Sequence, residues 1–372
     1  MNRRCFLLSA ASMYELKAAS GVKPIRTLDH FRMLAISPSG SMVCGAKYSS
    51  SGYSFTLTPK GLKGDKRQFE IDSRSSVQMI DVESGSTVVE FEGVMPLTSS
   101  FWANSANALI RGKDDPHEPV WIILDGTNRT SRRLTGVNFT PSSRATLEGC
   151  LLDWNKPRSE AGQFVVYSPT GKTLAAASAE PAGMQSRYNP AISPKVSPRG
   201  KEFLHSIDEV LILRSSEDLS VKWIQQYDPD AWNLYNVTFC PSGKLIALLQ
   251  VARRELNIRP KNRVLLLDPA DGKRLTILPV DFSEFGVVSA DQKFVAVATK
   301  RRTKALWEEY DLCIQIHSTA DGKVISELVH DRVPRHESVM DTSWDRTIAL
   351  AYTADNRYLI STGRKTNIWK QN

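Results

Sequence analysis

Short, almost continuously apolar segments recur along the chain, each lying between turn residues such as Gly, Asp, Pro and Ser. Clear examples are Leu245–Leu249, Val264–Leu267 and Phe294–Ala298. An alternating apolar and polar pattern indicates a strand with one wet face, whereas a continuous apolar run indicates a strand that is buried on both faces. In an antiparallel sheet, this pattern requires further sheets stacked on both sides.

These segments belong to a larger unit of short strands, which is clearest between residues 236 and 280. We expect its strands at Asn236–Cys240, Lys244–Val251, Arg263–Asp268 and Lys273–Val280. Pro-Ser-Gly and Asp-Gly sequences separate the strands, and these residues are typical of tight turns. The unit is therefore predicted to be a sheet of four antiparallel strands.

The unit repeats along the chain. We expect the first turns of successive copies at Gly40, Asn107, Ser143, Gly200, Gly243, Gln292 and Asn356. The spacing averages about 50 residues, near the longer periods of four-stranded repeats. The chain is therefore predicted to be an all-β repeat protein with seven copies, whose interfaces its 41% of hydrophobic residues would fill.

The turn sequences carry a resemblance to a known superfamily. They read SPSG, SPRG, CPSG and DPADGK, and Ile368-Trp369 stands where the superfamily has its Trp-Asp pair. The chain resembles a β-propeller of the WD-repeat and YVTN-type superfamily from about residue 22 to the C-terminus. The resemblance implies a seven-bladed propeller with four-stranded antiparallel blades. Most copies lack the Trp-Asp pair, so we expect apolar packing to replace the side-chain network that braces blades in the family.

The two ends of the chain are expected to share one blade. The last copy has strands at Ile348–Thr353, Arg357–Ser361 and Thr366–Lys370, and it lacks a fourth. A spare strand-like segment, Lys23–Leu28, precedes the first copy, and Pro24 suits an outer edge strand. We therefore predict that this segment closes the ring, and that residues 22–372 form a single propeller domain.

Residues 1–21 are predicted to be an N-terminal tail or an export signal. Arg3 and Arg4, followed by Cys5–Met13, resemble a twin-arginine signal. Glu15 and Lys17 interrupt the apolar stretch. We predict a cytoplasmic protein, with export through this twin-arginine-like signal as the alternative. No other run approaches the length that a membrane-spanning helix needs.

The composition does not identify a specific function or partner. The chain has five cysteines without metal-like spacing, and we expect them to be reduced packing residues. The net charge of +8 permits anionic partners without requiring them. The segment Tyr48–Ser76 is rich in Ser, Gly and Lys and is predicted to be an insertion in the first blade.

No sequence motif indicates a specific chemistry. The chain has no metal-ligand His pair, no nucleophile elbow and no phosphate-binding Gly-rich loop. We therefore predict no catalytic residue, no metal and no cofactor. His317 takes the position that Asp268 has at a strand end, and we expect it in a turn. His330 and His336 flank the basic loop Asp331–Arg335. Either could face a ligand, but we expect both to be exposed to solvent.

The remaining signal is the position of basic and aromatic residues. In propellers of the superfamily, the loops between the second and third strands and the loops between blades share one face. Here these loops are long and basic in the fifth, sixth and seventh copies, which a ring would make neighbours. The predicted binding residues are Trp232, Tyr235, Arg253, Arg254, Arg259, Lys261, Arg301, Arg302, Lys304, Trp307, Tyr310, Arg364 and Lys365. Arg beside Trp and Tyr is typical of interface hot spots.

The leading functional hypothesis is a non-catalytic scaffold that presents this face to a protein partner. The identity of that partner is not encoded in any motif, and an acidic or polyanionic ligand is also compatible with the charge. The first alternative is a propeller enzyme of the lactonase or hydrolase kind that uses the central mouth. The second is an adaptor for nucleic acid or another polyanion, whose binding would weaken steeply with salt.

Overall fold

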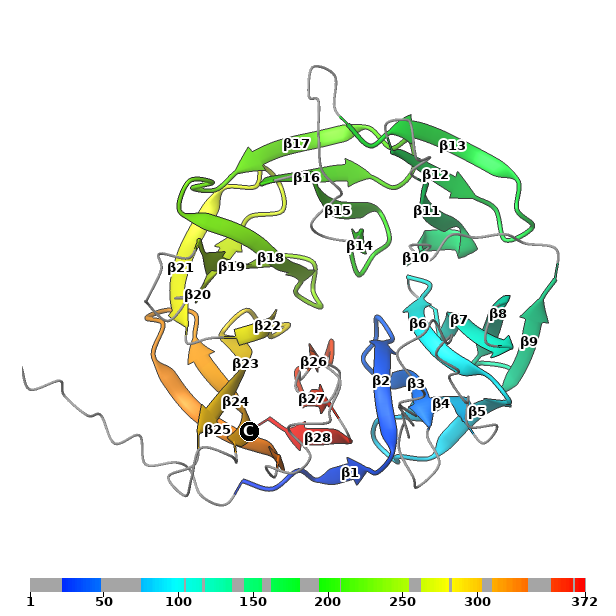
Figure 1. Ribbon diagram of the computed structural model, residues 1–372, viewed down its shortest axis with the longest axis horizontal. Helices are drawn as coiled ribbons and strands as arrows, with labels where there is room; N and C mark the ends of the chain where they lie inside the picture. Colours follow the sequence, from blue (N-terminus) through cyan, green and yellow to red (C-terminus); the bar gives the residue numbers. More distant parts are fainter. Residues whose placement is uncertain are drawn as a thin grey trace, which may run out of the picture.

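The computed structural model describes residues 22–47, 75–103, 105–115, 118–135, 144–155, 162–180, 194–207, 209–253, 262–280, 283–302, 310–333, 349–363 and 365–371. These residues form seven four-stranded antiparallel sheets, arranged as the blades of a ring (Figure 1). The predicted seven-bladed, all-β propeller is therefore confirmed. The predicted N-terminal tail lies outside the described residues, and so does the predicted insertion except for Ser75 and Ser76.

The blades are numbered in chain order, and each runs from an innermost first strand to an outermost fourth strand (Figure 1). Blade one contains β2 (Phe31–Ile36), β3 (Met42–Lys47), β4 (Ser76–Asp81) and β5 (Thr87–Glu92). Blade two contains β6 (Met95–Phe101), β7 (Asn107–Asp115), β8 (Glu118–Asp125) and β9 (Thr130–Leu134). Blade three contains β10 (Arg144–Ala145), β11 (Leu151–Asn155), β12 (Gln163–Tyr167) and β13 (Thr173–Ser178), with the short 3-10 helix η1 (Leu147–Gly149) between its first two strands.

The second half of the ring follows the same pattern. Blade four contains β14 (Lys195–Val196), β15 (Glu202–Ile207), β16 (Val210–Ser215) and β17 (Val221–Gln226). Blade five contains β18 (Trp232–Phe239), β19 (Ile246–Ala252), β20 (Asn262–Leu267) and β21 (Arg274–Val280). Blade six contains β22 (Ser283–Val288), β23 (Phe294–Arg302), β24 (Tyr310–Ser318) and β25 (Val324–Val333), and blade seven contains β26 (Ala349–Tyr352), β27 (Tyr358–Thr362), β28 (Thr366–Lys370) and β1 (Arg26–Leu28).

The core lies between blades, which explains the continuous apolar runs. In blade five, Leu248 belongs to a buried cluster that includes Leu204 of blade four, whereas its neighbour Leu249 belongs to a cluster that includes Val295 of blade six. Adjacent residues of a strand point to opposite faces of its sheet, so each face meets a different blade. The expectation that the middle strands are buried on both faces is therefore confirmed.

The turns between first and second strands use left-handed backbone conformations. Gly40, Gly200, Gly243, Gln292 and Asn356 have φ values between +62° and +78°. At Gly40, an added Cβ would lie 2.6 Å from the backbone nitrogen of Ala354 in blade seven. A side chain at Gly40 would therefore push apart the turns of the first and last blades.

Two of the expected first turns are displaced. Asn107 is the first residue of β7 rather than part of the turn before it. In blade three the first strand begins at Arg144, and the turn lies at Leu147–Gly149 instead of Ser143. Pro141-Ser142-Ser143 resembles the Pro-Ser-Gly turns of other copies, but it precedes the first strand of this blade.

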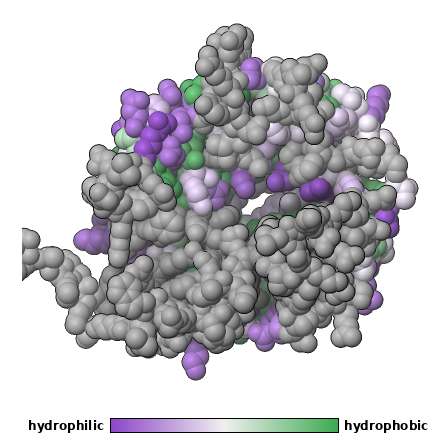
Figure 2. All heavy atoms as spheres, in the orientation of Figure 1, coloured by the Kyte–Doolittle hydropathy of each residue, from purple (hydrophilic) through white to green (hydrophobic). Residues whose placement is uncertain are grey.

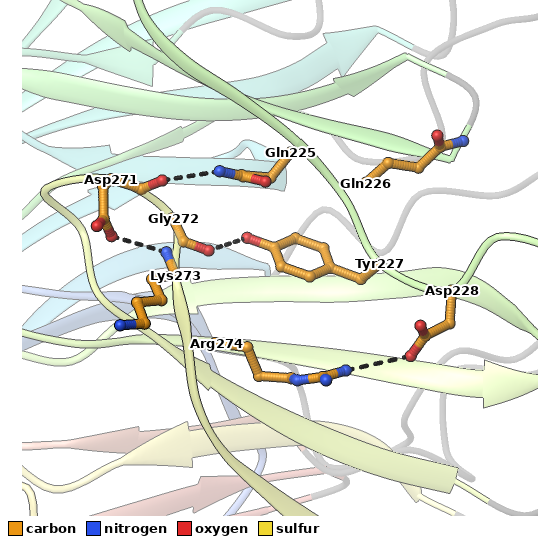
Figure 3. A pocket seen from close by; sticks show the side chains of 8 residues that line it. All are labelled: Gln225, Gln226, Tyr227, Asp228, Asp271, Gly272, Lys273 and Arg274. Atoms are coloured by element: carbon orange, nitrogen blue, oxygen red, sulfur yellow. Dashed lines mark hydrogen bonds and ion pairs between the residues drawn. The ribbon is translucent and has the colours of Figure 1, made fainter.

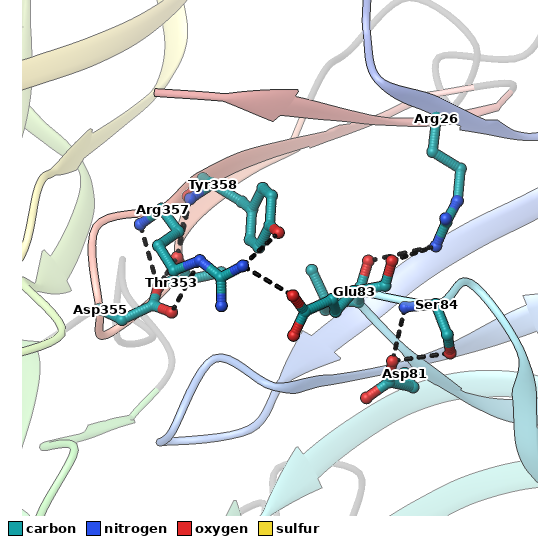
Figure 4. Close-up of polar contacts among 9 residues, drawn as sticks. Arg26, Asp81, Glu83, Ser84, Thr353, Asp355, Arg357 and Tyr358 are labelled. Atoms are coloured by element: carbon teal, nitrogen blue, oxygen red, sulfur yellow. Dashed lines mark hydrogen bonds and ion pairs between the residues drawn. The ribbon is translucent and has the colours of Figure 1, made fainter. Parts of the chain in front are cut away.

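The first and last strands of the chain belong to the same blade. β1 pairs antiparallel with β28, with Arg26 opposite Ile368 and Leu28 opposite Thr366. The Arg26 guanidinium donates a 2.8 Å hydrogen bond to the backbone carbonyl of Glu83 in blade one. Arg357 of blade seven donates to the Glu83 carboxylate at 2.7 Å (Figure 4). Glu83 thus contacts two arginines of blade seven, and these contacts join the two ends of the chain across a blade boundary.

A buried polar network braces blade seven, contrary to the expectation that apolar packing alone would do so. Trp369 Nε1 donates to Ser361 Oγ at 2.8 Å, and the His330 Nδ1 lies 2.7 Å from the same hydroxyl. Asn367 Nδ2 donates to the His330 carbonyl at 3.0 Å. His330 is only 2% exposed, so its expected exposure is wrong. The error arises because β25 continues to Val333 and carries His330 into the interface between blades six and seven.

The structure also bears on the expectations for His317 and for the cysteines. His317 is a buried residue of strand β24, so the expectation that it lies in a turn is wrong. Its Nδ1 lies 3.1 Å from the Gly322 carbonyl, across the turn that follows the strand. The four described cysteines form no disulfide, and burial raises the pKa of the Cys44 thiol to about 12. Among the described residues, no cluster of His, Cys, Asp and Glu is arranged to hold a metal ion. That part of the chain also has no helix long and apolar enough to cross a membrane.

A second buried polar cluster lies in blade four. The Arg214 Nε donates to His205 Nε2 at 3.1 Å, and its other nitrogens donate to the carbonyls of Leu219 and Ala179 at 2.8 and 3.0 Å. Phe164 packs against the His205 ring with 4.6 Å between ring centroids. Burial, and then the nearby Arg214 charge, lower the pKa of His205 to about 3. The imidazole must be neutral to accept the Arg214 hydrogen bond.

We expect His205 to make the protein sensitive to mild acid. Its pKa is lower in the folded than in the unfolded state, so the unfolded state binds more protons between pH 6.5 and about 3. Stability is therefore lost as pH falls below 6.5, by about 2 kcal/mol at pH 5 from this residue. Urea unfolding of the wild type and His205→Gln at pH 7.5 and pH 5 should show a smaller acid loss in the variant. Equal losses in both proteins would refute this assignment.

Candidate functional site

The strand directions place the predicted binding loops at one end of the blades. Because neighbouring strands are antiparallel, the start of a first strand, the end of the second and the start of the third share an end of the sheet. In blade five these positions are Trp232, Ala252 and Asn262, and in blade six Arg302 at the end of β23 pairs with Tyr310 at the start of β24. We call this end of the ring the loop face and the opposite end the turn face.

The structure describes only part of the predicted binding set. Trp232, Tyr235, Arg253 and Lys365 are described with their side chains. Arg301, Arg302 and Tyr310 are described as strand positions only. The other predicted residues lie outside the described ranges, and they are Arg254, Arg259, Lys261, Lys304, Trp307 and Arg364. The predicted arc as a whole therefore stays a prediction.

Trp232 is held in place by an arginine on the loop face. The Arg263 guanidinium carbon lies 4.1 Å from the centre of the partly exposed Trp232 ring. Arg263 also donates through Nε to Gln250 at 2.9 Å and through Nη2 to Asp228 at 2.6 Å. Gln250 in turn donates to the Tyr227 carbonyl at 2.9 Å. A cation over an aromatic face, fixed by two further bonds, gives a rigid aromatic surface. We call Trp232 and the Arg263 side chain that holds it the Trp232 platform.

Asp228 connects this platform to the outer edge of blade five. It has a left-handed backbone with φ of +49°, and its carboxylate accepts from both Arg263 and Arg274, the latter at 3.3 Å. The Arg263 hydrogen bond is the main cause that lowers the pKa of Asp228. The carboxylate therefore stays ionised and is engaged by guanidinium groups.

A polar surface pocket of about 550 Å³ lies beside Asp228, between blades four and five (Figure 3). It is lined by Gln225, Gln226, Tyr227, Asp228, Asp271, Gly272, Lys273 and Arg274. The Tyr227 hydroxyl donates to the Gly272 carbonyl, and the Gln225 amide donates to the Asp271 carbonyl at 3.0 Å. Burial raises the pKa of the Tyr227 phenol above its usual range. Much of the polar lining thus holds the two blades together, and the pocket shows no activated nucleophile.

Two cations of the predicted arc have acidic partners. Arg253 lies 3.4 Å from Glu209 of blade four, and Lys365 lies 3.3 Å from Asp331 of blade six. Glu209 also accepts a hydrogen bond from the Leu234 backbone at 3.0 Å. The described part of the face therefore carries mixed charge rather than a purely basic surface. The sequence shows the runs of Lys and Arg, but it does not show which isolated acids the fold brings beside them.

The sequence analysis also missed two cations on the innermost strands. Arg144 is the first residue of β10, and Lys195 is the first residue of β14. Figure 2 shows a narrow opening near the centre of the ring, with hydrophilic residues along the rim over β10 and β14. Each cation is the first residue of a strand of only two residues, and no run of adjacent charges marks it in the sequence.

Comparison with known proteins supports the fold. No family model matches the chain, and no curated protein is similar to it. The β-propeller domain of Myceliophteria thermophila Cps50 (Swd1) is 10% identical with a TM-score of 0.54, over 94% of this chain and all of that one. KlHsv2 with loop 6CD replaced by a Gly-Ser linker is 9% identical with a TM-score of 0.54, over 92% of this chain and 93% of that one. Kuenenia stuttgartiensis hydrazine synthase is 14% identical with a TM-score of 0.56, over 95% of this chain and 98% of that one. At these identities the likeness concerns the fold alone.

Proposed function

We propose that this propeller is a protein-interaction scaffold that binds its partner through the loop face of blades four to seven. The observation that carries the proposal is the Trp232 platform. Trp232 is partly exposed and is fixed by Arg263, while Tyr235 on the same strand is 50% exposed. Aromatic anchors that are rigid before binding lose little entropy on association and are common interface hot spots.

The described charges of the loop face favour a protein partner over a polyanion. Arg253 and Lys365 face Glu209 and Asp331, so the described surface offers both signs of charge. A polyanion would be repelled by these acids, whereas a protein surface can complement both signs. The proposal extends to the predicted binding residues that lie outside the described residues, including Trp307 and Arg364.

Substitution of the aromatic anchor should weaken the complex mainly through faster dissociation. We expect Trp232→Ala to cost about 2 kcal/mol or more, which is about a thirtyfold rise in Kd. Surface plasmon resonance with the purified partner would measure it, and thermal unfolding would verify that the variant is folded. Tyr235→Ala on the same strand should give a smaller loss. A partner that binds Trp232→Ala as tightly as wild type would exclude this platform.

Reversal of the charges in blade six should instead slow association. Arg301→Glu with Arg302→Glu changes two cations at the loop-face end of β23. The matched control, Lys293→Glu with Lys323→Glu, changes two exposed cations at the turn-face end of the same blade. We expect an association rate lowered by about tenfold at low salt for the first pair only, with the difference shrinking as salt rises. If the turn-face pair has the larger effect, the partner binds the opposite face.

A further inference from the structure

The outermost strand of blade three has an unpaired edge. β13 is the last strand in the order of its sheet, and Figure 1 shows it on the circumference of the ring. The Ala179 N–H, just after β13, donates to the Gly162 carbonyl beside β12 at 2.7 Å. Because successive residues of an antiparallel strand hydrogen-bond alternately to one side and the other, Ala177 also faces β12, whereas Ala176 and Ser178 direct their backbone groups outward. The outer edge of β13 therefore offers hydrogen-bonding groups to a further strand.

The composition of β13 distinguishes it from the other outermost strands. It consists of Thr, Leu, three Ala and Ser, with no charged residue and no proline. Each of the other outermost strands contains a charged residue, for example Glu90 in β5, Arg132 in β9 and Lys222 in β17. Charges and prolines on an edge strand prevent it from pairing with another chain. Among the described outermost strands of the seven blades, β13 is thus the one that lacks this protection.

The side chains of β13 are small, and one face of the strand is exposed. Ala175 and Ala177 pack against a buried cluster that contains Phe203 of blade four. On the opposite face, Leu174 is 52% exposed, and Ala176 is exposed as well. A strand added beside β13 would extend this face and cover part of the Leu174 side chain. Burial of this apolar surface favours association.

The edge of β13 is complementary to the same edge of a second copy. When two copies pair antiparallel about a twofold axis with Ala176 opposite itself, Leu174 lies opposite Ser178. In this register Lys172 lies opposite Glu180 at both ends of the paired segment, because the axis repeats every contact. The Lys172 side chain is exposed and the Glu180 side chain is partly exposed, so both are accessible. Opposite charges at facing strand positions favour pairing, and the small side chains between them leave room for a close approach.

We propose that the outer edge of β13 pairs with the same edge of a second copy of this chain, so that the third blades of two rings form one continuous sheet. A bulge between β12 and β13 lies at the start of β13 and leaves Ala175–Ser178 regular, so the paired segment is short. Small interfaces are typical of weak complexes, and we therefore expect a dimer whose population depends on concentration. This edge is on the circumference of the ring in blade three, whereas the Trp232 platform is on the loop face of blade five. The dimer does not depend on the proposed protein partner.

Sedimentation velocity of the full chain over about a hundredfold range of concentration would measure the dimer. We expect the wild type to shift from monomer toward dimer as the concentration rises. Ala176→Lys places two like charges opposite each other and should raise the dissociation constant of the dimer by about tenfold or more. Ala176→Pro removes an outward N–H that β12 does not use, and it should have a similar effect. The matched control, Ile277→Lys, adds the same charge at an exposed position of the outermost strand β21 and should dimerise like the wild type.

An exchange of charges tests the register. Lys172→Glu places two carboxylates opposite each other and should raise the dissociation constant by about fivefold, whereas Lys172→Glu with Glu180→Lys should regain the wild-type value. Trp232→Ala should dimerise like the wild type, which keeps this edge distinct from the partner surface. Equal dimerisation by Ala176→Lys, or no recovery in the exchanged variant, would refute the proposed pairing. A wild type that stays monomeric at every concentration would also overturn it and leave a strand of a different protein as the occupant of this edge.

Discussion

Deletion of residues 1–30 is expected to lower the melting temperature sharply. The deletion removes β1, which pairs with β28 at the outer edge of blade seven. It also removes the Arg26 hydrogen bond to the Glu83 carbonyl and the packing of Leu28 against the core between blades seven and one. Several hydrogen bonds and a partly buried Leu are together worth about 3 kcal/mol or more. We expect a decrease of about 4 °C or more.

The matched control is deletion of residues 1–20 only, which leaves the strand in place. We expect this shorter deletion to cost little, because segments before the first paired strand are seldom tied down. Differential scanning calorimetry of the three proteins would measure the effect. If the longer deletion melts at the wild-type temperature, the strand does not stabilise the closure of the ring.

Trp369→Ala is expected to be the most destabilising single substitution that we propose. Trp369 is 1% exposed and packs with Leu312 and Ile314 of blade six and with Leu359 of blade seven. Loss of a buried Trp side chain typically costs about 3–5 kcal/mol. The substitution also leaves the Ser361 hydroxyl without its indole donor. Urea unfolding followed by tryptophan-independent circular dichroism would measure the loss.

Trp369→Phe distinguishes the loss of packing from the loss of the indole hydrogen bond. The phenyl ring retains most of the packing but cannot donate to Ser361, so we expect a loss of about 1–3 kcal/mol. Ser361→Ala removes the acceptor, and the double variant should lose less than the sum of the single losses, because both residues act through one hydrogen bond. Strict additivity would show that the indole hydrogen bond does not contribute to stability.

The sequence predicts the fold well because the signals for it are local. Continuous apolar runs such as Val264–Leu267 show that both faces of a strand are buried, and turn residues such as Gly243 mark where a strand ends. Both depend on neighbouring residues, and the strands of blade five match the predicted ranges to within a few positions. The shifted turn in blade three shows the limit of such signals. Pro141-Ser142-Ser143 has the composition of a turn, but only pairing with β11 shows that the first strand starts after it.

The candidate site was predictable in outline only. The sequence identifies Trp232 and Arg253 as members of basic and aromatic loops, and strand alternation places such loops on one end of the blades. It does not reveal that Asp228 and Gln250 hold Arg263 against Trp232. These residues are far apart along the chain, and no spacing rule connects them.

The sequence by itself determined the architecture, namely the number of blades, their strand content and the positions of most turns. The tertiary structure decided which side chains meet across blade boundaries, as with His330 beside Ser361 and Arg253 beside Glu209. The physical reason is the distance along the chain between the residues that determine each feature. Backbone turns and strand burial follow from neighbouring residues, whereas hydrogen bonds, charge pairs and pKa shifts depend on contacts that exist only once the ring has brought separate blades together.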